Sequence, residues 1–209
     1  EAFAERLGSM ANRDIDAAHL QNMLVKYSYA FLKLDNTEAI NEVVRVGRKL
    51  SRAIHNEEDI EQLRWALFDM NCHVQDFDAA LAILNNQENA PTQRIELLKN
   101  KILAHQAMKE GKSDEAVRRF RKFMKEVEAM DENQFDPIRR EIIPVQSILG
   151  LNAMRIAEIL DKAGKETEAR ESYKEAQKHY KAALGRLNRS NQREEIKEKL
   201  AEIEEALGE

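Results

Sequence analysis

Apolar residues recur at helical spacing along almost the whole chain, and this periodicity limits the fold more than any other feature of the sequence. Two of the clearest stripes are Leu20, Met23, Leu24, Tyr27 and Phe31, and Ile60, Leu63, Leu67, Met70 and Val74. Residues at such steps of three and four share one face of an α-helix. No segment shows the strict apolar–polar alternation of a half-buried strand over several residues. We therefore expect an all-α protein without appreciable sheet.

The composition agrees with a helical protein and excludes several other classes. The 209 residues include 7 Gly and 3 Pro, too few for the many turns of a β-sandwich or barrel. The single cysteine, Cys72, excludes an intramolecular disulfide and a zinc site built from paired cysteines. No apolar run approaches the roughly 20 residues that span a bilayer. The compartment stays open between the cytoplasm and export with the signal removed.

Turn and capping residues stand between the apolar stripes. The breaks are at Asp35-Asn36, Asp76, Gly111 and Gly164. Glycine tolerates the left-handed conformation that ends many helices. Asn36 and Ser113 are suited to cap the helices that follow. The sequence thus predicts a succession of helices joined by short turns.

Two of these breaks lie in closely related local sequences. Residues 110–116 and 163–169 match at Gly, Lys, Glu and Ala when one is shifted by 53 positions. A small residue just after each turn lets the second helix of a hairpin lie close to the first, and a large apolar residue one turn later fills the space beside it. The small residues are Ala39, Ala80, Ala116 and Ala169. We read this pattern as a set of helical hairpins.

These landmarks resemble the tetratricopeptide repeat. The resemblance is carried by the Gly, the Ala five positions later and the aromatic residue four positions after that. It covers residues 19–187, although the alanines are 41, 36 and 53 residues apart, where the family period is 34. The family's early Trp is also missing. The resemblance implies one domain over 1–209, a right-handed α-solenoid of about four antiparallel hairpins, with repeats at 19–56, 58–90, 92–130 and 150–187.

Two segments fall outside the repeats. Residues 131–149 are interpreted as an insertion that lengthens the following helix, with Asp136-Pro137 as its start and a kink or break at Pro144. The segment 190–208 has Ile196, Leu200, Ile203 and Leu207 on one face and mainly glutamates on the other. A terminal repeat must end its apolar stack with a polar face, so this segment is expected to be a capping helix.

A search for chemical motifs finds little. There is no phosphate-binding loop, nucleophile elbow or zinc helix. Asp69, Cys72 and His73, with His105, are the nearest approach to a metal or nucleophile site, but a groove wall with incidental polar groups is the preferred interpretation. We therefore expect no catalytic residues, no metal and no cofactor. The basic patch at 118–122 is read mainly as a solvated helix face, since an isolated patch is a weak indication of phosphate binding.

The resemblance implies a protein–protein interaction module that holds a peptide or protein segment in a concave groove. The groove residues that it implies are Leu24, Ser28, Phe31, Trp65, Asp69, His73, Lys101, His105, Arg155 and Glu158. Trp65 is either an amphipathic anchor in this groove or a core residue between hairpins. Nucleic acid and a membrane span are not expected, and self-association is favoured if a repeat end is left apolar.

Two other function classes are weighed against this module. A sensor or regulatory domain of a larger protein would use the same groove for a small ligand, and an all-helical enzyme is the least supported class. An open trough favours a peptide, and a closed pocket with converging polar groups favours a small ligand.

Overall fold

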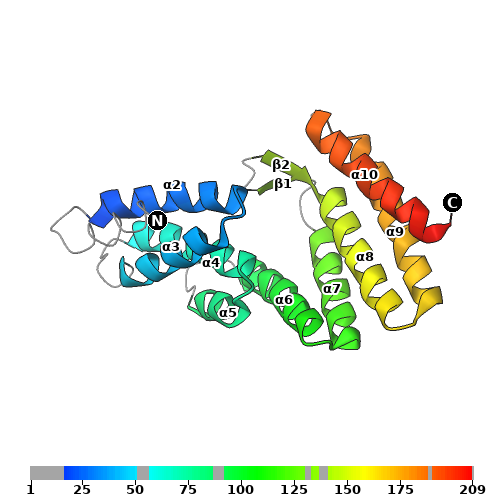
Figure 1. The fold of residues 1–209 in the computed structure, drawn as a ribbon, viewed down its shortest axis with the longest axis horizontal. Coiled ribbons are helices and arrows are strands. Elements are labelled where there is room, and N and C mark those ends of the chain that lie inside the picture. Colours follow the sequence, from blue (N-terminus) through cyan, green and yellow to red (C-terminus); the bar gives the residue numbers. More distant parts are fainter. Residues whose placement is uncertain are drawn as a thin grey trace. The chain divides into compact units, whose positions relative to one another are not determined.

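The computed structural model describes residues 17–50, 57–86, 92–129, 133–136, 141–187 and 190–208. The chain forms two compact units. Helices α2 to α5 belong to the first unit, and α6 to α10 belong to the second (Figure 1). The expected repeat ends at 56, 90 and 130 lie outside the described residues.

The first unit consists of two helical hairpins. Its helices are α2 (Ala17–Lys33), α3 (Thr37–Leu50), α4 (Glu57–His73) and α5 (Phe77–Asn85). Helix α2 packs on both α3 and α4, and α4 also packs on α5. The fully buried side chains of its core include Leu24, Ile40, Leu63 and Met70. The apolar stripes of the sequence are therefore the inner faces of these helices.

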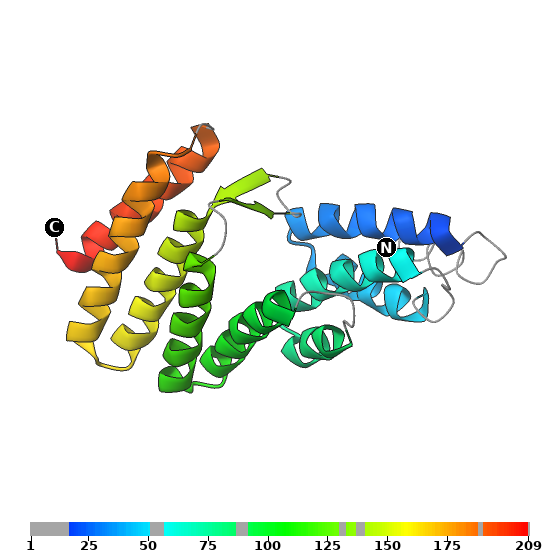
Figure 2. The same cartoon turned by 180° about the vertical axis from the view of Figure 1, so that it is seen from behind.

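The second unit contains two more hairpins and a final helix. Its helices are α6 (Thr92–Lys109), α7 (Ser113–Glu128), α8 (Val145–Lys162), α9 (Glu166–Leu184) and α10 (Ser190–Leu207). Helix α7 packs on α6 and α8, and α9 packs on α8 and α10. Both views show α8, α9 and α10 side by side (Figures 1 and 2). The predicted apolar face of α10 is buried in this unit's core.

The described chain is helical apart from one short β-hairpin, so the all-α class is confirmed. Strands β1 (Asn133–Asp136) and β2 (Glu141–Pro144) pair antiparallel, with Asn133 opposite Pro144 and Asp136 opposite Glu141. This pair of four-residue strands is the sheet of the described residues, so the expectation of no appreciable sheet agrees with the structure. The bent helix expected over 131–149 is wrong, because residues 133–136 and 141–144 are strands. Pro137, the expected first residue of that helix, lies outside the described residues.

The two prolines explain why a strand pair forms where a helix was expected. A residue before proline avoids the helical region, which keeps Asp136 and Ile143 extended. The neighbouring Ile142 and Ile143 are β-branched and favour a strand. Pro144 ends β2 and is the capping residue of α8. It does not kink a helix there, because the missing N–H of a proline costs nothing before the first turn.

All four hairpins turn through the same backbone geometry. Each turn has one residue in the left-handed region two positions after the first helix ends: Asp35 (φ 51°), Gln75 (φ 58°), Gly111 (φ 73°) and Gly164 (φ 72°). The next residue donates its backbone N–H to the carbonyl five positions earlier, at 3.2 Å for Asn36 and 2.9 Å for Asp76, Lys112 and Lys165. This is a helix-terminating bond pattern of the Schellman type. The hairpins are thus structural repeats of one motif.

The shared geometry corrects the sequence alignment in the first hairpin. Five positions after the left-handed residue stand Ile40, Ala80, Ala116 and Ala169, all fully or almost fully buried. The first hairpin therefore places Ile40 where we expected Ala39, which is partly exposed. Asn36 caps as predicted, because its Oδ1 accepts the backbone N–H of Ala39 at 3.0 Å. Ser113 does not cap, because it is already inside α7, and Lys112 stands at the cap without a side-chain hydrogen bond.

Candidate functional site

Two of the predicted groove residues in the first unit are not on its surface. Leu24 and Ser28 are completely buried. The Ser28 hydroxyl donates to the backbone carbonyl of Val25 at 2.8 Å, which satisfies it inside the helix. Phe31 is partly buried and packs against the core of this unit. Leu24 and Ser28 lie on the buried face of α2, which packs on α3 and α4. Their assignment to a groove is therefore wrong.

The predicted residues of α4 have access to solvent but are tied to neighbours. Trp65 is partly buried, lies edge-on to Phe68 with ring centroids 5.7 Å apart, and donates its Nε1–H to Glu61 at 3.4 Å. Asp69 accepts a hydrogen bond from the Tyr29 hydroxyl at 3.2 Å. The exposed ring of His73 is 2.7 Å from the Asp35 carboxylate. These contacts join α4 to α2 and to the first turn.

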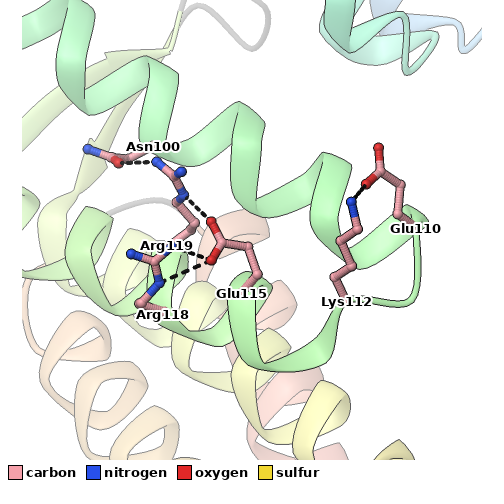
Figure 3. Close-up of polar contacts among 6 residues, drawn as sticks. All are labelled: Asn100, Glu110, Lys112, Glu115, Arg118 and Arg119. Atoms are coloured by element: carbon pink, nitrogen blue, oxygen red, sulfur yellow. Dashed lines mark hydrogen bonds and ion pairs between the residues drawn. The ribbon is translucent and has the colours of Figure 1, made fainter.

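The basic patch on α7 is paired with carboxylates of the same helix. Glu115 accepts from the Nε–H groups of Arg118 at 3.1 Å and Arg119 at 2.7 Å (Figure 3). Arg119 also donates to the buried Asn100 Oδ1 of α6 at 3.4 Å. Lys122 lies 3.9 Å from Glu126. Three of the four basic side chains of this patch therefore lie within 4 Å of a carboxylate of the same helix, and the Asn100 contact joins α6 to α7.

The structure brings two predicted site residues from distant parts of the sequence together. Arg155 Nη1 on α8 lies 3.4 Å from His105 Nε2 on α6. Burial lowers the pKa of His105 to about 3, and the positive charges of Arg155 and Lys101 act in the same direction. His105 is therefore neutral at pH 7, and its Nε2 accepts the hydrogen bond from Arg155. The ring also lies edge-on to Phe120 of α7, with centroids 5.1 Å apart.

Arg155 sits in a partly buried position beside Tyr180 of α9. Burial lowers the pKa of its guanidinium, while Tyr180 and Glu158 act in the opposite direction. Burial also raises the pKa of the Tyr180 hydroxyl. Gly150 makes room for Tyr180, because a Cβ at Gly150 would stand 2.9 Å from the ring. Among the described residues, no carboxylate forms an ion pair with Arg155.

The side chains around this contact form a surface that we call the α6–α8 face. It consists of Lys101, His105 and Met108 on α6, and Leu151, Arg155 and Glu158 on α8. Each set has the helical spacing i, i+4, i+7. In each set the middle residue is partly buried and the two outer residues are exposed, Met108 by 43% and Leu151 by 37%. Of the predicted groove residues, Lys101, His105, Arg155 and Glu158 lie on this face.

Sequence reasoning missed Leu151 and Tyr180. Gly150 was the available signal, because a glycine inside a helical stripe often marks a close approach of another side chain. Asn152 was also missed: it donates to the Ile148 carbonyl at 2.7 Å, and its buried Oδ1 has no partner among the described residues.

The described residues contain no group of three or more His, Cys, Asp and Glu side chains arranged to hold a metal ion. Within the same ranges, no helix combines the length and apolar character of a membrane span. Comparison with protein-family models and with curated proteins finds no match to this sequence.

Proposed function

We propose that this chain is a non-enzymatic, tetratricopeptide-like interaction module that binds an extended peptide or protein segment on the first helices of its hairpins. The observation that carries the proposal is the α6–α8 face. It is composed of the first helices of two successive hairpins, and it combines apolar and charged side chains. The right-handed solenoid implied by the sequence resemblance is part of this proposal.

The common turn geometry supports the repeat assignment. In four hairpins the first helix is followed by one residue in the left-handed conformation and by the same backbone hydrogen bond. The four left-handed residues are separated by 40, 36 and 53 positions. Repetition of one hairpin is typical of solenoids, in which each unit buries its apolar face against its neighbours. Solenoids present extended surfaces, and protein segments bind to such surfaces.

The chemistry of the α6–α8 face suits a peptide. Met108 and Leu151 offer exposed apolar contacts, and methionine adapts its shape to different partners. Lys101, Arg155 and Glu158 supply charges of both signs. Arginine is enriched in the residues that dominate binding at protein interfaces. A mixed surface of this kind fits side chains that alternate along an extended segment.

The test is a selection of peptides on the full chain. A random-peptide phage library is panned against the purified protein, and the selected peptides are measured by fluorescence anisotropy. Met108→Glu and Leu151→Glu place a carboxylate on the face and should weaken binding at least about tenfold, because they put a charge against the desolvated centre of an interface.

The control variant is Arg121→Gln. It changes the net charge by the same amount, and the residue is exposed on α7, a second helix. We expect it to bind like the parent. The proposal fails if no peptide is selected, or if the two face variants bind as well as the control.

A further inference from the structure

Helix α4 of the first unit places an aromatic ring between two carboxylates. Glu61, Trp65 and Asp69 have the spacing i, i+4, i+8, which puts them in one row on the helix surface. All three are partly buried, so each keeps some contact with solvent. Tyr29 of α2 joins this row, because its neutral hydroxyl donates to Asp69 at 3.2 Å. We call these four side chains the Trp65 face.

Glu61 differs from the other partly buried glutamates whose side chains are described. Those are Glu42, Glu115 and Glu126, and each of them forms an ion pair with an arginine or a lysine. Glu61 instead accepts the neutral indole N–H of Trp65 at 3.4 Å, and within the described ranges it forms no ion pair. A carboxylate that is partly removed from water is stabilised when a cation pairs with it. The Trp65 face therefore has a charge that an incoming cation would complement.

The charges around the Trp65 face favour a cation from outside. Helix α4 carries five acidic residues and one arginine. That arginine, Arg64, lies three positions after Glu61, yet the two form no ion pair. Lys26 and Lys33 of α2 are exposed, and in the described part of the chain they pair with neither carboxylate of the face. The excess of negative charge raises the local concentration of cations at this surface.

The indole ring is held in a defined orientation for such a contact. Its Nε1–H bond to Glu61 fixes one edge of the ring. The buried Phe68 lies nearly perpendicular to it, at 82° and with ring centroids 5.7 Å apart. The face of an indole attracts cations more strongly than any other side-chain ring. Because the ring is already oriented, little side-chain freedom is lost when a ligand binds to it.

We propose that the Trp65 face binds the cationic side chain of an arginine or lysine in the bound protein segment, with the cation on the indole ring and its N–H groups on the carboxylates of Glu61 and Asp69. This inference rests on the proposed function, and it adds a surface on the first unit that selects for positive charge. Hydrogen bonds between a cation and a carboxylate are among the strong ones in proteins. An arginine can stack on an indole and donate to a carboxylate at the same time.

The first experiment uses N-acetylargininamide as the probe and needs no peptide. Trp65 is the single tryptophan of the chain, so its fluorescence reports on this face alone. The full chain is titrated at constant ionic strength, with N-acetylcitrullinamide as the matched control, because a urea group has nearly the size of a guanidinium without the charge. The arginine compound should give a saturable change, and the citrulline compound should give none. The inference is overturned if neither the arginine compound nor its lysine equivalent gives a saturable change, or if the citrulline compound acts equally.

The second experiment separates a binding role of the carboxylates from a structural one. Glu61→Gln and Asp69→Asn remove the charge but keep an oxygen that can accept the same internal hydrogen bond. Each should weaken the binding of N-acetylargininamide by about three- to tenfold. Glu38→Gln is the matched control, because it removes the same charge from an exposed position on α3 of the same unit, and it should bind like the parent. Equal affinity in all three variants overturns the inference, and melting temperatures verify that each variant folds.

The peptides selected on the full chain connect this face to the proposed function. Replacing the bound arginine or lysine of such a peptide by citrulline or norleucine should weaken its binding to the parent. The same replacement should have little effect with Trp65→Leu, which keeps an apolar side chain but lacks the ring. Peptides that bind equally to the parent, to Glu61→Gln and to Trp65→Leu overturn the inference but leave the proposed function intact. A saturable response to N-acetylargininamide without any selected peptide would support the cation site and contradict the proposed function.

Discussion

The two units build the same turn with different residues. In the second unit, the left-handed position is filled by Gly111 and Gly164, and in the first by Asp35 and Gln75. Glycine adopts a positive φ without steric cost, whereas side chains with a Cβ adopt it rarely. The backbone hydrogen bonds are nevertheless the same in both units. The repeat is therefore a property of the backbone, and its sequence signature is strong only where glycine fills the turn.

The units also differ in what fills the helix contact after the turn. Alanine stands there in three hairpins, and Ile40 stands there in the first. Four positions later come Val44, Leu84, Phe120 and Tyr173, which range from fully buried to partly buried. The same backbone therefore accommodates side chains of different volume, and this difference can be measured.

The largest effect is expected at Phe120. It is fully buried in the second unit and contacts the His105 ring. Phe120→Ala should lower the free energy of unfolding by about 3–5 kcal/mol, measured by urea denaturation. Tyr173 occupies the equivalent position but is partly exposed, so Tyr173→Ala should cost less. Equal losses at the two positions would contradict the difference in burial between Phe120 and Tyr173.

A larger side chain should lower the stability more at the alanine contacts than leucine does at the isoleucine contact. Ala116→Leu and Ala169→Leu each force a larger side chain into a fully occupied helix contact and should cost about 1–3 kcal/mol of stability. Ile40→Leu conserves volume and should cost less than about 1.5 kcal/mol. Unchanged melting temperatures for both alanine variants would mean that the equivalence of these positions is wrong.

These positions also show what the sequence could predict. The buried stripes, the four breaks and the face of α10 follow from helical periodicity, which depends only on neighbours along one helix. The turns at Asp35 and Gln75 gave no glycine signal. The sequence alignment placed Ala39 at the buried helix contact that Ile40 occupies. This error of one residue could not be detected from the sequence, because the two residues are adjacent and both are apolar. The β-hairpin was missed since periodicity cannot reveal pairing between short strands.

The candidate site was proposed from the sequence resemblance. Lys101, His105, Arg155 and Glu158 were placed in it by carrying the hairpin geometry of the tetratricopeptide repeat onto this chain. Leu24 and Ser28 were misplaced, because α2 contacts both α3 and α4 and turns that face inward. The contact between His105 and Arg155 joins residues 50 positions apart. The lowered pKa of His105 depends on burial by other helices. The sequence of a single helix does not indicate that burial.

The pH dependence of stability should distinguish the buried imidazole of the second unit. The folded pKa of His105 is lowered to about 3 from an unfolded value of about 6.5. Between these values the unfolded chain binds the extra proton, so the contribution of neutral His105 is present above pH 6.5 and is lost as the pH falls. His105→Gln removes the titration and keeps an acceptor for Arg155.

The parent should therefore lose stability relative to His105→Gln by at most about 1.4 kcal/mol per pH unit below pH 6.5. Urea denaturation at a series of pH values gives this difference, and the contribution of His179 cancels because both proteins contain it. A difference that does not change with pH would show that His105 is solvated. It would also remove the reason for assigning Nε2 as the acceptor.

The smallest effect on stability is expected at the left-handed position of the turn. Adding a Cβ there in the second unit should destabilise the chain, and removing one in the first unit should stabilise it. A Cβ at Gly111 meets no atom within 4 Å, so Gly111→Ala changes only the backbone preference. A left-handed conformation costs a residue with a Cβ about 1–2 kcal/mol. The smaller entropy of unfolded alanine returns about 0.4–1 kcal/mol of this. Gly111→Ala should therefore destabilise the chain by about 1 kcal/mol.

The opposite exchange can be made at Gln75, where a side chain with a Cβ occupies the left-handed position. Its φ of 58° already carries the cost of a Cβ in the left-handed region. Gln75→Gly should be more stable than Gln75→Ala by about 1 kcal/mol, since both variants lack the glutamine side chain and differ only in the Cβ. Thermal unfolding of the pair isolates the backbone from any contact that the glutamine makes. If alanine were the more stable of the two, the first unit would not share the turn geometry of the second, and the structural equivalence of the hairpins would have to be abandoned.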